Sequence, residues 1–528
     1  MRDYHLPGRS PALATNAMVA TSHPLAAAEA LDILRSGGNA VDAAVAGAVL
    51  LGVCEPQMTG LAGDIFALVK TGPDADVVAL NGSGRAPAKS DAEALRAEGL
   101  DRIAPGHPAS VTLPGAVDGF VKLSERFGKI GLDRILAPSI HYFEQGVPIA
   151  PRVSFDIRTI PETFNDAAKT HYLKGGAPYA SGDVFALPGQ AEILRRVAKD
   201  GRDAFYTGEV VDDMLSALHA SGGVHTAEDF AAVEATWSNP ISGEYRGRTL
   251  HEHPPNGQGA TAILLANILA QFDVAALDPN GAPRLHLEAE ATRLAYDARN
   301  RFLADPDHMD RLNLFLDADH GAKLAAKIDP NRASATVTPV TEEVHKDTIL
   351  ITVVDRDGMM VSLIYSTFAT FGAGIGTDKF GLLFHNRGSG FNLTPGHPNE
   401  IAPGKRPMHT IIPAMSGQGD TIDTTFGVMG GQYQACGHAH VLSNLVDFGM
   451  DPQEALDAPR VFANPQSGLL DVERGVPAEV RQALADMGHA VNTPDRPIGG
   501  GQMIMTDQTR GVLIGASDHR KDGLAIGY

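Results

Sequence analysis

The sequence is poor in cysteine and has no long apolar run. Its 528 residues include two cysteines, Cys54 and Cys436, so a disulfide framework is excluded and a reducing compartment is favoured. The N-terminal segment MRDYHLPGRS has no apolar stretch of the kind that a signal peptide needs. No apolar run of about 18 residues follows, which is the length a membrane helix requires. We therefore expect a cytoplasmic protein that does not cross a membrane.

Positive charge is also scarce. Lysine and arginine number 43 against 63 aspartate and glutamate residues, and the formal net charge is −20. A surface of that sign repels phosphate backbones and anionic lipids, so we expect neither nucleic acid nor membrane as a partner. The composition is otherwise ordinary for a globular protein, with 43% hydrophobic and 20% charged residues. The length allows three or four domains, or one large α/β body.

Motifs of cofactor-binding sites and of serine-hydrolase sites are missing as well. The sequence has no Walker loop, no dinucleotide-binding fingerprint and no Gly-x-Ser-x-Gly elbow. The segment Cys436–His440 does not have the ligand spacing of a standard zinc site. A predicted amphipathic helix over 284–304 carries His286 and Glu290, which we expect on a solvated helix face rather than around a metal. We predict that the chain uses no metal and no cofactor.

The strongest local signal is a β-hairpin. An apolar, β-branched run over 348–355 is followed by Asp357-Gly358 and a second run over 359–365. Glycine accepts the positive φ that tight hairpin turns require. Because the turn centre lies near residue 357, pairing of the two strands would place Thr348 beside Ser366. On pattern alone, Thr348 is typical of a threonine that begins a strand.

The N-terminal part predicts two helices and a buried strand. Ser22 is expected to cap a helix over Leu25–Arg35, which ends at Gly37-Gly38. A second, alanine-rich helix over Asn39–Leu51 has small residues that allow close packing, so we expect it to be buried. The strand Ile65–Val69 follows.

A polar segment precedes the hairpin. Residues 332–347 have no apolar period. This composition suits an ordinary surface linker, and it equally suits a segment that moves after the chain is cut.

Longer sequence motifs occur along the whole chain. HPLA and GGNAVDAAVA occur near the N-terminus, and KRP at 405–407 and GASD at 515–518 lie in the second half. With the hairpin, they resemble the γ-glutamyltransferase family over nearly the whole chain, from about residue 17 to 528. The resemblance implies an α+β fold, the four-layer αββα sandwich of the N-terminal-nucleophile hydrolases.

The same resemblance implies self-processing. In this family the precursor cuts itself before a threonine, which here means between Asp347 and Thr348. The expected products are a large chain, 1–347, and a small chain, 348–528, which remain together as one body. Assembly of several such pairs into a homo-oligomer stays open.

Chemistry explains why a threonine must start the small chain. A hydroxyl is a weak nucleophile at neutral pH and needs an adjacent base. An α-amino group has a pKa of about 7.7–8.0, so it can take that proton. Ser366 matches a family hydroxyl that hydrogen-bonds the nucleophile. Gly430 and Gly431 match the paired glycines whose N–H groups form the oxyanion hole.

The family's γ-glutamyl clamp is absent at its usual positions. Ser83 stands where the family has an arginine for the substrate α-carboxylate, and Gly390 stands where it has an aspartate for the α-ammonium. An alternative is that Arg85 is the family's arginine, shifted by a small offset. Phe368 replaces a helping asparagine. A buried charge without its partner costs about 3–5 kcal/mol. Strict γ-glutamyl specificity is therefore not expected.

Other residues are available to bind a substrate. Arg387 can make paired hydrogen bonds to a carboxylate, and Arg85, His409 and Thr410 are further candidates for substrate binding. A structural ion pair remains an alternative for Arg387, as a core hydrogen bond does for His409. The patterns NRGxGF and RPxHTxxP resemble the oxamate amidohydrolase branch of the family.

The expected function is hydrolysis of a small, carboxylate-bearing amide such as oxamate, through an acyl-Thr348 ester and attack by water. Two alternatives remain. One is a glutathione hydrolase or γ-glutamyl transpeptidase with a rebuilt clamp. The other, from a different class, is an unprocessed relative without catalytic activity.

Overall fold

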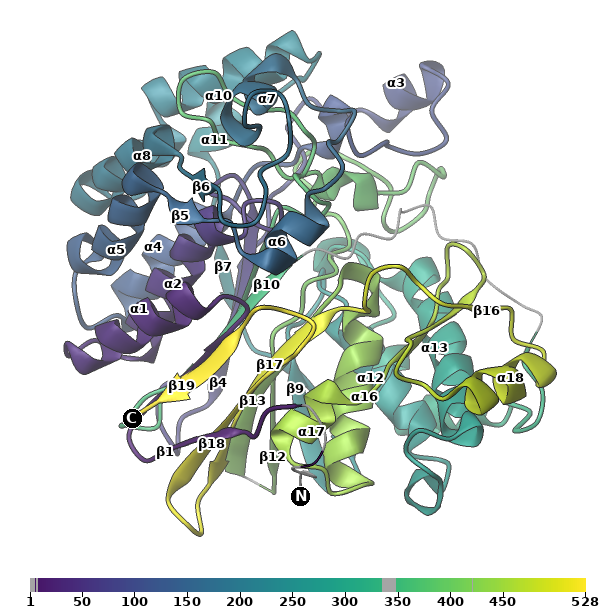
Figure 1. The fold of residues 1–528 in the computed structure, drawn as a ribbon. Helices are drawn as coiled ribbons and strands as arrows, with labels where there is room; N and C mark the ends of the chain where they lie inside the picture. Colours follow the sequence, from purple (N-terminus) through teal and green to yellow (C-terminus); the bar gives the residue numbers. More distant parts are fainter. Residues whose placement is uncertain (1–4, 6–7, 335–347, 420) are drawn as a thin grey trace.

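The chain folds into two stacked β-sheets between two layers of helices (Figure 1). The computed structural model describes residues 5, 8–334, 348–419 and 421–528. Each large sheet has seven strands, and β10 and β11 of one sheet pack against β13 and β17 of the other. The predicted four-layer αββα sandwich is confirmed, and each sheet buries one face against the other and one against helices.

The first sheet contains the predicted hairpin at its centre. Its order is β19 (Leu524–Gly527), β2 (Met18–Thr21), β10 (Ile349–Val354), β11 (Met360–Ser366), β3 (Asp64–Lys70), β4 (Val77–Gly82) and β7 (Thr236–Ser238). All neighbours are antiparallel. Strands β10, β11 and β3 are buried along their whole length, as their apolar composition requires.

The second sheet has the order β1 (Ala12–Ala14), β18 (Val512–Ser517), β17 (Gly500–Asp507), β13 (Thr421–Met429), β12 (Ala414–Gln418), β9 (Arg248–Glu252) and β8 (Ile241–Tyr245). Both sheets therefore combine strands from before residue 334 with strands from after residue 348. A shared sheet of this kind joins the two parts through backbone hydrogen bonds.

One helical layer covers the first sheet. Helices α1 (Pro24–Arg35), α2 (Ala40–Cys54) and α4 (Ala116–Phe127) contact its strands. Outside them, α5 (Leu132–Gln145) packs on α2, α8 (Pro188–Asp200) packs on α5, and α10 (Glu209–Ala220) packs against α9 (Asp203–Tyr206) and α11 (Ala227–Ala231). Helix α2 is buried throughout, as predicted. The N-cap of α1 is His23, not Ser22, because His23 Nδ1 accepts the hydrogen bond from Leu25 N at 3.2 Å. The Ser22 hydroxyl instead donates to Glu55.

The opposite layer includes α12 (Gly259–Leu269), α13 (Ala282–Phe302), α16 (Gln434–Val446) and α17 (Pro452–Asp457). The prediction of a solvated face at His286 and Glu290 is wrong, because both residues are buried. His286 contacts His489 at 2.8 Å, and Arg293 pairs with Glu290 and lies 3.3 Å from His489. A metal cation placed among these side chains would face the guanidinium of Arg293.

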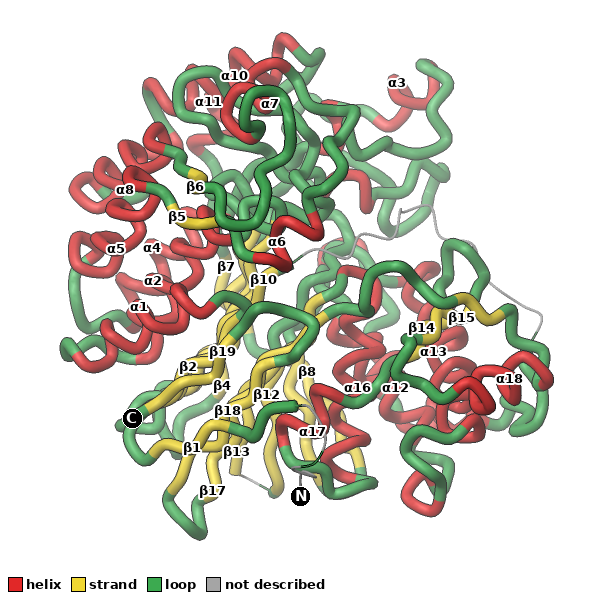
Figure 2. The backbone as a smooth tube through the Cα atoms, viewed as in Figure 1, coloured by secondary structure: helices red, strands yellow, loops and turns green. Residues whose placement is uncertain are grey.

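Shorter elements complete the fold, with the loops that Figure 2 distinguishes. They are α3 (Ala92–Ala97), α6 (Pro151–Asp156), α7 (Asp166–Tyr172), α9 (Asp203–Tyr206), α11 (Ala227–Ala231), α14 (Asn313–Leu316), α15 (Ala318–Ala325), α18 (Ala478–Asp486), the pair β5 (Val147–Pro148) and β6 (Val184–Phe185), and the sheet of β14 (Val461–Ala463), β15 (Leu470–Val472) and β16 (Val491–Asn492). Within the described residues, the helices are too short or too polar to cross a bilayer.

Candidate active site

The predicted pairing of Thr348 with Ser366 is confirmed. Ile349 lies opposite Tyr365 in the β10–β11 register, so the next pair outward is Thr348 and Ser366. Their hydroxyl oxygens are 3.4 Å apart, and Thr348 is 1% exposed. Asp347, the residue before the expected cleavage, lies outside the described residues.

A third side chain extends this pair into a row. Ser366 also lies opposite Asp64, the first residue of β3. Directly opposed residues of antiparallel strands present their side chains on the same face of the sheet. Thr348, Ser366 and Asp64 therefore stand side by side across three strands, and all three are buried.

Asp64 is surrounded by groups that favour its charged form. Oδ1 accepts a hydrogen bond from Gly84 N at 3.0 Å, and Oδ2 lies 3.1 Å from His409 Nε2. His385 Nδ1 and Arg387 Nε are 3.5 and 3.9 Å from Oδ2. Burial raises the pKa of a carboxyl group, yet these neighbours lower the pKa of Asp64 to about 2.

The structure brings Arg387 and Thr410 together. Arg387 Nη1 donates to Thr410 Oγ1 at 2.9 Å, and the guanidinium lies 3.9 Å from the centre of the Phe368 ring. Phe368 has a φ of 76°, a costly left-handed conformation for a bulky residue, and its N–H donates to Ser366 Oγ at 2.8 Å. Phe368 therefore contacts both the guanidinium of Arg387 and the hydroxyl of Ser366.

His409 has both ring nitrogens engaged within the protein. Nε2 contacts Asp64, and Nδ1 accepts a hydrogen bond from Ile411 N at 3.3 Å. The ring also packs against Phe66, with centroids 4.6 Å apart. Burial, with the nearby positive Arg387, lowers the pKa of His409 to about 3, so the ring is neutral at physiological pH. This geometry matches the core hydrogen bond considered as its alternative role.

The two glycines lie where a strand passes into a helix. Gly430 and Gly431 follow β13 and precede α16, with φ values of 127° and 55°. A Cβ atom on Gly430 would lie 2.8 Å from Gly499 Cα, so a side chain does not fit. Backbone N–H groups at the start of a helical segment point toward a region that favours negative charge.

Gln258 joins the glycine turn to the arginine side of the site. Its Nε2 donates to Gly431 O at 3.0 Å and to Thr410 O at 2.8 Å. Arg299 Nη1 in turn donates to Gln258 Oε1 at 2.9 Å. These bonds fix Gly431 relative to the Thr410–Arg387 pair.

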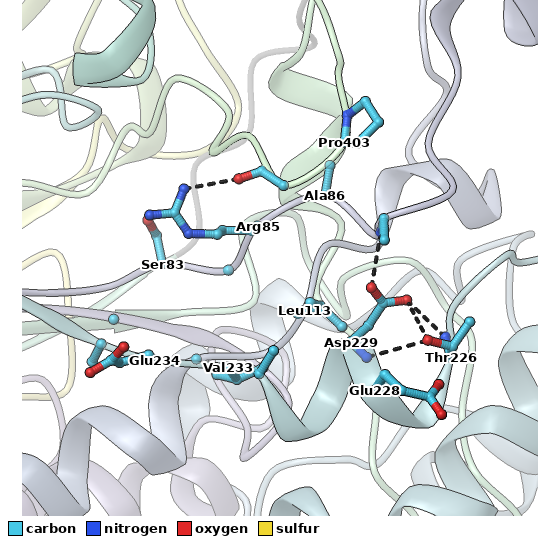
Figure 3. A pocket seen from close by; sticks show the side chains of 17 residues that line it. Ser83, Arg85, Ala86, Leu113, Thr226, Glu228, Asp229, Val233, Glu234 and Pro403 are labelled. Atoms are coloured by element: carbon cyan, nitrogen blue, oxygen red, sulfur yellow. Dashed lines mark hydrogen bonds between the residues drawn. The ribbon is translucent and has the colours of Figure 1, made fainter.

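Arg85 lies elsewhere. Its Nη1 donates to Gly404 O at 2.9 Å and is 3.7 Å from Asp305. Its side chain lines a cavity of about 460 Å³. Asp229 and Thr226 line another part of the same cavity (Figure 3). The structure does not bring Arg85 together with Arg387, and its role in substrate binding stays a prediction.

Asp64, His385 and Gln258 were not predicted from the sequence as site residues. A signal for Asp64 existed, because an acidic residue begins the otherwise apolar strand DIFALV. His385 directly precedes the NRGxGF pattern, but no spacing rule relates it to Asp64. Gln258 lies in the segment HPPNGQG, far from the hairpin in the sequence, and no motif marks it as a site residue.

Comparisons with known proteins decide the family. The model of the γ-glutamyltranspeptidase family matches residues 26–528. The chain belongs to the γ-glutamyltranspeptidase family. As a member of this family it is an enzyme that hydrolyses amide bonds.

Relatives within the family have different named activities. The glutathione hydrolase-like YwrD proenzyme of Bacillus subtilis strain 168 is 32% identical, over 98% of this chain and 99% of its own length. The oxamate amidohydrolase proenzyme of Klebsiella pneumoniae is 31% identical, over 98% and 99%. The crystal structure of cephalosporin acylase from Bacillus halodurans superposes with a TM-score of 0.92, at 36% identity, covering 100% of this chain and 99% of that one.

Proposed function

We propose that the chain is a precursor that cleaves itself between Asp347 and Thr348 and then uses Thr348 as its nucleophile. The buried hydroxyl of Thr348 beside Ser366 supports this role. The relatives named above as proenzymes support processing. Cleavage exposes the α-amino group of Thr348, which supplies the base that the hydroxyl needs.

The reaction then proceeds in two halves. Thr348 Oγ attacks the amide carbonyl while its α-amino group takes the hydroxyl proton, and the N–H groups of Gly430 and Gly431 stabilise the oxyanion. The tetrahedral intermediate collapses, the leaving amine takes the proton and an acyl-Thr348 ester remains. Water, deprotonated by the same amino group, attacks the ester and releases the carboxylic acid.

The proposed substrate is a small amide whose acyl group carries a carboxylate, such as oxamate. The fully buried guanidinium of Arg387 is the observation that supports this proposal. It packs on the ring of Phe368, whose backbone N–H donates a hydrogen bond to Ser366 Oγ. A buried arginine presents several N–H donors in a fork that matches a carboxylate. Hydrolysis of oxamate would yield oxalate and ammonia.

A second candidate is hydrolysis of a γ-glutamyl amide such as glutathione. Asp64 and Arg387 are the two residue types that an amino-acid clamp needs, and they lie 3.9 Å apart. The Asp64 carboxylate, however, is wholly buried and already accepts hydrogen bonds from Gly84 and His409. Each carboxylate oxygen can still accept one more hydrogen bond, but the negative charge of Asp64 is already balanced by Arg387, so the first candidate is favoured.

One experiment separates these possibilities. Purified protein is analysed by denaturing gel and N-terminal sequencing, and ammonia release from oxamate is measured beside release of aniline from a γ-glutamyl anilide. We expect a small chain that begins at Thr348 and a higher kcat/KM with oxamate. A higher value with the anilide would favour the γ-glutamyl candidate. An uncut and inactive chain would favour a non-catalytic relative.

Cytoplasmic location and assembly of the paired chains into oligomers stay predictions. Cell fractionation tests the location, and sedimentation of the processed protein tests the assembly.

A further inference from the structure

We infer that Asp64 is a specificity-determining residue that sets the charge of the acyl pocket by acting as the buried counter-ion of Arg387. The inference rests on the proposed function, in which Arg387 faces the acyl group of the substrate. Asp64 stands in the same row as Thr348 and Ser366, so its charge lies beside the reacting centre.

Asp64 acts on Arg387 by charge and not by a hydrogen bond. The separation between Asp64 Oδ2 and Arg387 Nε is 3.9 Å, which is longer than the 2.7–3.2 Å of a hydrogen bond. Two contacts that hold the guanidinium do not involve Asp64, namely the 2.9 Å hydrogen bond to Thr410 and the stacking on Phe368. Loss of the Asp64 charge therefore leaves these two contacts in place.

The histidines around Asp64 do not add a positive charge. His409 Nδ1 accepts from Ile411 N, so its proton is on Nε2, facing Asp64. His385 Nδ1 accepts from Arg387 N, and its Nε2 donates to Thr112 O at 2.9 Å. Burial lowers the pKa of both rings. The four side chains of Asp64, His385, Arg387 and His409 consequently carry a net charge of zero.

A neutral cluster has a definite consequence for substrates. The carboxylate of an acyl group that binds Arg387 also experiences the negative charge of Asp64 behind it. Charges about 6 Å apart, at the effective dielectric constant of about 20 that suits such sites, change affinity by roughly a hundredfold. Asp64 therefore limits the preference for anionic acyl groups and lets the pocket accept uncharged ones of the same shape.

The test compares oxamate with pyruvamide, in which a methyl ketone replaces the carboxylate. In processed Asp64→Asn protein we expect the ratio of kcat/KM for oxamate to that for pyruvamide to rise at least tenfold over the unmodified enzyme. Asp118→Asn is the matched control, because Asp118 is also wholly buried and pairs with Arg202. We expect that control to leave the ratio unchanged. An unchanged or lower ratio in Asp64→Asn would overturn the inference.

A binding measurement covers the case of a variant that processes but does not turn over. Calorimetric titration with oxalate should show at least tenfold tighter binding to processed Asp64→Asn, and to Asp64→Ser if the asparagine variant does not fold. Equal or weaker binding in the folded variant contradicts the inference. The oxamate rate of the unmodified enzyme tests the proposed function separately, because oxalate binding does not require turnover.

Discussion

Replacement of Arg387 by glutamine tests the substrate assignment. The side chain keeps much of its length and its ability to bond Thr410, but it loses the positive charge and the forked set of donors. Charge-assisted hydrogen bonds contribute about 1.5–3 kcal/mol each. A net loss equal to one such bond should lower kcat/KM for oxamate about 10- to 150-fold, at roughly 1.4 kcal/mol for each factor of ten.

The loss should be mainly in KM. The substrate carboxylate does not react, so Arg387 binds it equally in the ground state and in the transition state. Pyruvamide, which has no carboxylate, should lose much less. Steady-state ammonia release with both substrates measures the two parameters.

A control and a second readout separate substrate binding from folding. Arg284 is 3% exposed, pairs with Glu288 and lies on α13, away from the hydroxyl row. Arg284→Gln should lower the melting temperature without changing the substrate ratio. Self-cleavage should persist in Arg387→Gln. If Arg387→Gln loses cleavage and oxamate turnover to the same extent, Arg387 has a structural role and the assignment is refuted.

Three further predictions concern the remaining parts of the site and its surroundings. Gly430→Ala places a Cβ atom 2.8 Å from Gly499 Cα, so the turn must shift. In an amidase assay kcat should then fall by about 10²–10³, which is the cost of losing one oxyanion donor. A normal kcat would contradict the oxyanion role. Ser366→Ala removes the hydroxyl that contacts Thr348 and accepts a hydrogen bond from Phe368 N. Loss of a hydrogen bond of roughly 1.4 kcal/mol should slow both processing and turnover about tenfold. Unchanged rates would exclude Ser366 from the mechanism. Burial lowers the pKa of five histidines to about 3–4 in the folded chain, against 6.5 in the unfolded chain, so the unfolded chain binds more protons below pH 6.5. Thermal stability should therefore fall from pH 6.5 toward pH 4, by up to about 1.4 kcal/mol per pH unit for each of these histidines; a melting temperature constant over this range would contradict it. The five are His23, His225, His253, His409 and His489.

The central hairpin could be predicted because its information is local. The Asp357-Gly358 turn between two apolar runs fixes the register, and the register fixes the contact between Thr348 and Ser366. The fold class came from the resemblance to a family, since no periodicity in the sequence states which strands of the two sheets become neighbours.

The environment of Asp64 could not be predicted in the same way. Its partners come from segments more than 300 residues away, at His409 and Arg387, and only the packed sheet brings them together. The helix that carries His286 was expected to expose its polar side, but His489, from the loop between α18 and β16, contacts His286 there. A sequence shows which side chains are present, whereas the partners of each buried polar side chain depend on tertiary packing.

The most direct test of this account is the mass of the small chain during turnover. Purified protein is mixed with oxamate, quenched in acid and analysed by intact-mass and peptide mass spectrometry. We expect a small chain that begins at Thr348 and carries an acyl group on that residue, and we expect Thr348→Ala to stay uncut and inactive. Turnover of oxamate by protein whose residue 348 is still joined to residue 347 would contradict it.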